Sequence, residues 1–175
     1  MLTIRPERPA DYPAIEDILK ACFGREGQNE AFNEWTLVRA IRRDPAYIPA
    51  LSLAALEDGA IVGHVLFSRC HIGDTPSLAL APLAVRPDRQ RRGIAAALVQ
   101  KGLELAACMG EKTSLVLGGP YYTRFGYAPI PQGITLAEGL DEHLYLLELA
   151  KGAAQGLTGQ VRYCRPFYDE EGRLL

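Results

Sequence analysis

The chain has 175 residues, of which 48% are hydrophobic and 23% charged, and its formal net charge is −2. This length and mixture predict one globular domain, which we place at residues 1–168, followed by a loose tail at 169–175. The slight negative charge argues against a wholly basic nucleic-acid binder, so any anion site must be local.

The four cysteines are isolated, and none forms a CxxC pair. This spacing predicts neither a zinc site nor a redox pair, and it favours reduced thiols in a cytoplasmic protein. The three histidines have no metal-ligand spacing, so no metal is expected. The first residues are charged and no long apolar run follows, so we expect no signal peptide and no contact with a membrane.

The N-terminal part predicts a short strand and two helices. Residues 2–8 have strand character, and apolar residues at helical spacing predict a helix over 10–23 with Asp11 as its N-cap. A second helix is expected over 33–43, and it should end before Pro45, because the residue before proline avoids helix.

A hairpin and a further strand follow. Two runs rich in strand-forming residues flank Asp58 and Gly59 within 52–72, and an Asp-Gly pair is a strong turn signal. Residues 77–85 form another apolar strand, with Pro82 inside it.

The remaining segments alternate between helix and strand. A helix is predicted over 93–110, with an apolar face formed by Ile94, Leu98, Leu105 and Met109. We expect a buried strand over 113–119, one or two helical turns over 121–125, and final strands over 143–150 and 160–166.

The densest positive charge of the chain, in residues 86–92, lies just before the helix that begins near Gly93. The first N–H groups of a helix have no internal partners and, with the helix dipole, bind anions. Gly93 lets a ligand approach the backbone closely. Arginines at this end oppose the dipole unless an anion lies between them, which favours a phosphate-bearing ligand. The alternative is an arginine-rich loop that only keeps the protein soluble.

Three motifs between residues 80 and 127, taken together, resemble those of the GNAT superfamily of acyl-CoA-dependent N-acyltransferases. The stretch "QRRGIA" at 90–95 resembles its Q/R-x-x-G-x-G/A signature, "LAPLAVRPD" its fourth strand and following turn, and "YYTRFGY" its Tyr-x-x-x-Gly-aromatic ending. The resemblance extends to about Tyr127, and the remaining residues resemble a bacterial branch known mostly by prediction.

This resemblance implies an α/β (α+β) fold. Its central sheet is mixed but mostly antiparallel, splayed between the fourth and fifth strands, with helices on both faces. Pro82 cannot donate a ladder hydrogen bond, so an interrupted ladder is expected there. The resemblance also implies an acetyl-CoA site formed by Leu83, Ala84, Val85, Gln90, Arg91, Arg92, Gly93, Ile94, Ala95 and Ala96.

The same resemblance implies that Tyr122 is the catalytic acid that protonates the departing CoA thiolate, since a phenol can donate to a thiolate at neutral pH. Tyr121 should point elsewhere. No carboxylate lies within 78–85, where many relatives have a glutamate base, so the base is left open. The candidates are Glu26, Glu30, Glu34, His64 and a water molecule, although a lone histidine on a central strand is more often a core residue.

The expected function is therefore N-acetyl transfer from acetyl-CoA to a primary amine, by direct attack in a ternary complex. The acceptor and the acyl-chain preference stay open, and the protein is expected to be a monomer or a homodimer. The alternative is a non-catalytic acyl-CoA-binding sensor or partner module. No aromatic residues are interleaved with the basic loop, so nucleic acid is not an expected partner.

Overall fold

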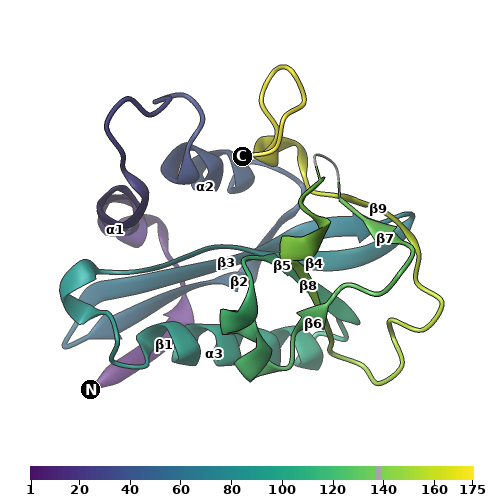
Figure 1. The fold of residues 1–175 in the computed structure, drawn as a ribbon. Helices are drawn as coiled ribbons and strands as arrows, with labels where there is room; N and C mark the ends of the chain where they lie inside the picture. The colour runs from purple at the N-terminus through teal and green to yellow at the C-terminus, as the bar shows by residue number, and fades with distance from the viewer. Residues whose placement is uncertain (137–138) are drawn as a thin grey trace.

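The computed structural model describes residues 1–136 and 139–175 (Figure 1). Its main sheet has the order β1-β2-β3-β4-β5-β8-β6, and β9 pairs with both β3 and β7. The strands are β1 (Leu2–Pro6), β2 (Tyr47–Glu57), β3 (Ala60–Ile72), β4 (Thr75–Val85), β5 (Thr113–Leu117), β6 (Ala128–Pro129), β7 (Ile134–Thr135), β8 (Leu144–Glu148) and β9 (Gly159–Arg162). The α-helices are α1 (Tyr12–Phe23), α2 (Glu34–Ile41) and α3 (Ile94–Cys108).

Helices cover both faces of this sheet. Helices α1 and α2 lie on one face and α3 on the other (Figure 1). Along the path from β1 to β6, the β4–β5 pair is parallel and the other pairs are antiparallel. The predicted mixed, mostly antiparallel sheet between helices is therefore confirmed.

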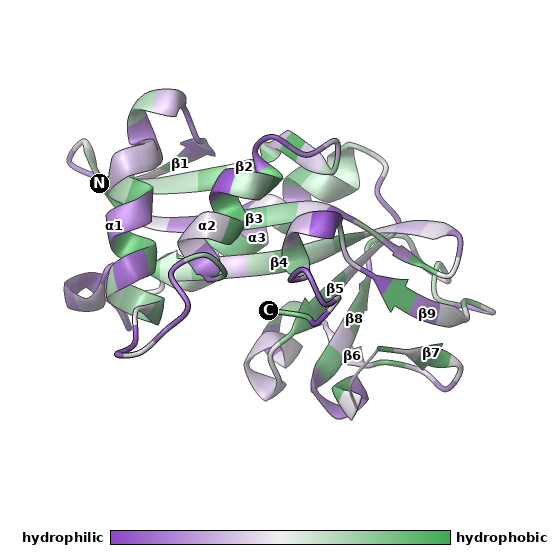
Figure 2. Cartoon of the chain, turned by 90° about the horizontal axis from the view of Figure 1, so that it is seen from above, coloured by the Kyte–Doolittle hydropathy of each residue, from purple (hydrophilic) through white to green (hydrophobic). Residues whose placement is uncertain are grey.

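Two apolar cores result from the alternation of side chains along the strands. On β2, Leu53 and Ala55 pack in the core beneath α3, whereas Ala54 packs in the core beneath α1 and α2. Figure 2 shows the apolar middle of β2, β3 and β4 that both cores share. These strands are buried on both faces, so they form a rigid support for the loops at their ends.

Local signals explain most element ends. The β2–β3 turn has positive φ at both Asp58 (49°) and Gly59 (84°), as a two-residue type I′ hairpin turn requires, and the predicted hairpin is confirmed. Asn33 caps α2, because its side-chain oxygen accepts from the Thr36 N–H at 3.0 Å.

The structure corrects two details of the predicted helix ends. Asp11 is at the N-cap position of α1, as predicted, but its side chain makes no capping hydrogen bond, since its carboxylate accepts from the Arg8 N–H at 2.7 Å and pairs with Arg5 at 2.6 Å. Met109 does not belong to the apolar face of α3: the helix ends at Cys108, and Met109 is 49% exposed. The two-residue strands β6 and β7 were not predicted, because such short runs carry no periodicity.

The C-terminal residues fold back on the molecule. The Asp169 N–H donates to the Arg173 carbonyl at 2.9 Å, and the Leu175 N–H donates to the Phe167 carbonyl at 2.9 Å. Within the described residues, no helix has the length and apolar character needed to cross a bilayer.

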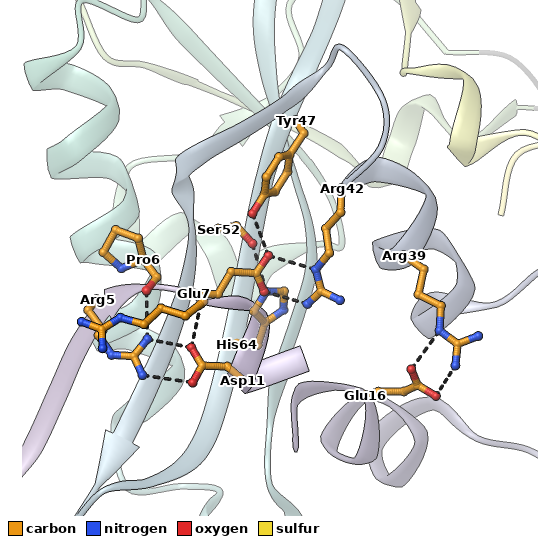
Figure 3. A network of polar contacts seen from close by, with 11 residues as sticks. Arg5, Pro6, Glu7, Asp11, Glu16, Arg39, Arg42, Tyr47, Ser52 and His64 are labelled. Atoms are coloured by element: carbon orange, nitrogen blue, oxygen red, sulfur yellow. Dashed lines mark hydrogen bonds and ion pairs between the residues drawn. The ribbon is translucent and has the colours of Figure 1, made fainter. Parts of the chain in front are cut away.

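A buried ion-pair network ties the N-terminal segments to the sheet (Figure 3). The fully buried carboxylate of Glu7 accepts from Arg42 at 2.7 Å and from the Tyr47 hydroxyl at 2.9 Å, and His64 Nε2 lies 3.2 Å away. Burial alone would raise the pKa of Glu7, but the hydrogen bonds from His64 and Arg42 outweigh it and hold that pKa well below its usual range. His64 also lies 3.2 Å from the Ser52 hydroxyl, so it is a core residue.

The contact between α3 and β3 leads to a stability prediction. A Cβ at Gly102 would clash with the buried ring of Phe67, so Gly102→Ala should destabilise the fold by about 1–3 kcal/mol through overpacking. Helix propensity alone would favour the alanine by about 1 kcal/mol. Urea unfolding measures the difference, with the exposed Gln100→Ala as the neutral control. A Gly102→Ala protein as stable as the parent would contradict this packing.

Candidate functional site

The pairing of β4 with β5 stops early. In the described part of the chain these strands pair only at Leu78 with Ser114 and at Ala79 with Leu115, and beyond these positions they diverge. On the other side of β4, the register with β3 gains one residue between Leu80 and Leu83. This bulge contains Pro82, which has no N–H to donate. The predicted interruption and splay are therefore present.

The ladder also determines which backbone groups face the gap. The Arg86 N–H donates to the Val62 carbonyl at 2.8 Å, so alternation along β4 directs the N–H and C=O of Leu83 away from β3. Ala84 has the opposite orientation and faces His64 on β3. The Val85 carbonyl accepts from the Gln90 side chain at 3.0 Å and from the Cys22 thiol at 3.2 Å. Of the three predicted residues, Leu83 thus presents an open N–H and C=O pair to the gap.

A cavity of about 530 Å³ lies at the N-terminus of α3. All the predicted acetyl-CoA residues line it except Ala84 and Arg92. Arg91 and Gly93 have positive φ (60° and 80°), which turns the loop tightly before the helix begins. A Cβ at Gly93 would meet no heavy atom within 4 Å, so the space beside the first helical N–H groups is open. We call this space the donor cavity.

Three residues that the sequence analysis did not select also line the donor cavity: Arg89, Tyr121 and Arg124. The Arg124 guanidinium lies 4.3 Å from the centre of the Tyr121 ring, which holds its charge beside the loop. Arg89 pairs with Glu57 at 3.1 Å. The available signal was the three-residue spacing of Tyr121 and Arg124, which places both on one side of a 3₁₀ turn.

A second cavity, of about 280 Å³, opens at the β4 bulge; we call it the acceptor cavity. It is lined by Phe23, Glu34, Leu37, Leu80, Ala81, Pro82, Leu83, Leu117, Tyr122, Tyr163, Phe167, Leu174 and Leu175. Among the described residues, Leu83 alone lines both cavities, so they meet at this residue.

Tyr122 reaches the acceptor cavity because Gly118 leaves room for its ring. A Cβ at Gly118 would lie 2.6 Å from that ring. Burial, followed by the neighbouring Tyr121, raises the pKa of Tyr122 to about 12, so the phenol is protonated at neutral pH. Tyr121 packs edge-on against Tyr122 and lines the other cavity, so the two side chains point to different sides.

The candidate bases separate clearly. Glu34 is the one described residue with a carboxylate side chain that lines the acceptor cavity, and the Asn33 cap fixes the helical turn that carries it. Glu26 and Glu30 are exposed on the preceding loop and do not line the cavity. His64 lies in the Glu7 network.

These features define the class of protein. It has a mixed sheet that splays between β4 and β5, with the open, arginine-lined start of α3 on one side of the gap and Tyr122 on the other. The chain belongs to the acetyltransferase (GNAT) family, whose model matches residues 12–127, and it is an N-acetyltransferase.

Similar proteins span nearly the whole chain. The uncharacterized N-acetyltransferase YjhQ of Escherichia coli K12 is 36% identical over 176 residues, covering 91% of this chain and 94% of YjhQ. The structure of Escherichia coli YhbS in complex with CoA matches with a TM-score of 0.86 at 29% identity, covering 98% of this chain and 96% of that one. A GNAT family acetyltransferase from Brucella melitensis, in complex with acetyl-CoA, matches with a TM-score of 0.77 at 30% identity, covering 95% and 98%.

The open space at Gly93 leads to a binding prediction. Gly93→Glu should raise the dissociation constant for CoA at least ~10-fold, which is 1.4 kcal/mol, because the new carboxylate occupies the space where a phosphate would approach and repels it. Isothermal titration calorimetry measures this constant. Gly110→Glu is the matched control: Gly110 follows the opposite end of α3, with φ of 83° and an equally open surrounding. Equal CoA affinity in the two variants would show that the phosphates bind elsewhere.

Proposed function

We propose that this protein transfers the acetyl group of acetyl-CoA to a primary amine by direct attack in a ternary complex. The observation that carries the proposal is the meeting of the donor and acceptor cavities at Leu83, where β4 and β5 diverge. Two separate cavities that share one lining residue suit two substrates bound at once. The CoA and acetyl-CoA complexes of the similar structures support the choice of donor.

The α3 start and its arginines would bind the donor phosphates. The first helical N–H groups and the dipole favour the pyrophosphate, and Arg91 and Arg124 line the same space. The side-chain amide of Gln90 donates a hydrogen bond to the Val85 carbonyl. We therefore assign to Gln90 the role of positioning the loop against β4.

The open N–H of Leu83 would stabilise the charge that develops on the thioester oxygen during attack. A preorganised backbone donor is effective because it needs no reorientation as the charge forms. The amine nitrogen forms a bond to the carbonyl carbon and the carbon–sulfur bond breaks. The products are an amide and the CoA thiol.

Two protons move in this reaction, and two residues of the acceptor cavity suit them. Tyr122, whose pKa is raised to about 12, holds a proton to give to the departing thiolate. Glu34 would take the proton that the attacking amine loses, because it brings a carboxylate to this cavity.

The direct test of the function combines binding with turnover. Saturating acetyl-CoA, at a hundredfold over its dissociation constant, should stabilise the fold by about 2.7 kcal/mol and raise Tm by roughly 5–10 °C. A panel of primary amines should then release CoA thiol, measured with a thiol reagent. An unchanged Tm sinks the proposal. A raised Tm without thiol release from any amine favours a non-catalytic acyl-CoA-binding module.

The acid and base assignments lead to paired variants. Tyr122→Phe and Glu34→Gln should each lower kcat by about 10²–10⁴, the usual effect of losing a positioned proton donor or acceptor, with KM for acetyl-CoA nearly unchanged. Tyr121→Phe and Glu30→Gln are the matched controls, because they remove the same groups outside the acceptor cavity.

Either assignment fails independently. If Tyr122→Phe keeps more than about a third of kcat, far inside the expected range, another group protonates the thiolate. If Glu34→Gln keeps more than about a third of kcat, a water molecule is the base instead.

A further inference from the structure

Most of the side chains that line the acceptor cavity are apolar. Phe23, Leu37, Leu80, Leu117 and Phe167 form much of the surface, and Glu34 is the one described lining residue with an ionisable acidic side chain. The other polar side-chain groups of the described lining are the hydroxyls of Tyr122 and Tyr163.

The C-terminal segment, defined here as residues 163–175, completes this surface. Tyr163 and Phe167 are 8% and 5% exposed, and their ring centres lie 4.8 Å apart. Leu174 and Leu175 line the same cavity as Pro82 of the bulge. Figure 2 shows the end of the chain beside the point where β4 and β5 diverge.

Several hydrogen bonds within this segment fix its conformation. The Leu175 N–H donates to the Phe167 carbonyl, and the Asp169 carboxylate accepts from the Arg173 N–H at 2.8 Å. The Arg173 side chain also donates to Asp169 at 2.8 Å. The segment is therefore an ordered wall, which can select the shape of what it contacts.

The number and sign of the charges on an amine determine how well it binds in such a cavity. One ammonium group can pair with Glu34, but a polyamine such as spermidine would carry more cations than the described lining has acidic groups, and a substrate carboxylate would be buried without a partner. An unpaired buried charge is strongly unfavourable. An apolar body gains by leaving water, at roughly 25 cal/mol per Å² of apolar surface.

We propose that the acceptor is a small monoamine whose primary amino group is carried on an apolar body, and that the C-terminal segment binds this body. The inference rests on the proposed function, since it names the acceptor of the same reaction. It places specificity in residues 163–175 and the chemistry at Leu83, Tyr122 and Glu34.

The experiment compares amines that differ in one property. The panel is 2-phenylethylamine and 3-methylbutylamine (apolar monoamines), spermidine (a polyamine) and glycine (a zwitterion). With acetyl-CoA as donor, kcat/KM should be at least ~10²-fold higher for 2-phenylethylamine than for spermidine or glycine, because burying a charge without a partner is strongly unfavourable. A reversed order overturns the inference and leaves the proposed function intact.

A variant tests the wall itself. Leu174→Asn keeps the approximate size of the side chain but makes it polar, so KM for 2-phenylethylamine should rise about 10-fold while KM for acetyl-CoA stays constant. The exposed Glu170→Gln in the same segment is the matched control, and both variants are checked for an unchanged Tm. An unchanged amine KM in Leu174→Asn overturns the assignment of the wall.

A binding arm separates this inference from the proposed function. Calorimetric titration of the CoA-loaded protein with each amine reports on the cavity without chemistry. Tighter binding of 2-phenylethylamine without thiol release supports the cavity assignment and overturns the transfer reaction. No preference for apolar amines in either assay overturns the inference.

Discussion

The extra residue in β4 at Ala81–Pro82 is the constraint on which the site depends. It ends the pairing of β4 with β5 after two positions and leaves the Leu83 N–H and C=O directed into a gap. Unpaired backbone groups are unfavourable inside a protein unless something else satisfies them. In this fold the gap is retained because the strands on either side of it are anchored elsewhere: β4 by its long ladder with β3, and β5 by its ladder with β8.

The donor cavity and the acceptor cavity are built from different kinds of structure. The donor cavity rests on the start of α3, a helix packed on the rigid core beneath the sheet, so its geometry follows from regular backbone. The acceptor cavity is lined by the end of α1, the start of α2 and the C-terminal segment, which lie around the bulge. Elements joined by long loops can change without disturbing the sheet, which suits a part of the site that selects the substrate.

The sequence predicts the parts of this molecule that local chemistry determines. Asp58-Gly59 specifies its hairpin, Pro82 its interruption, and the loop before Gly93 its helix start, because each signal acts over a few residues. The missing side-chain cap at Asp11 has a clear cause: Arg5 and the Arg8 N–H bind the same carboxylate, and spacing alone does not reveal these partners.

The acceptor cavity was beyond sequence reasoning for a different reason. Phe23, Glu34, Tyr122 and Leu174 are far apart in the chain, and no periodic pattern links them. Three glutamates lie within 26–34, and only the path of the chain shows that Glu34 faces the cavity while Glu26 and Glu30 face solvent. Residues such as Leu174 have no chemical mark as site residues, because an apolar wall uses the same side chains as a core.

The Glu7 network has a consequence for the tolerance of the protein to acid. The pKa of Glu7 is depressed in the fold, so its contribution to stability is full above the ordinary carboxyl value of 4.5 and is lost as the pH falls towards the folded value. Its partner Arg42 lies at the C-terminal end of α2, the helix whose first residue is Glu34. Strong acid would therefore loosen α2 and the acceptor side of the molecule, while the start of α3, on the opposite face of the sheet, has no link to this carboxylate among the described contacts.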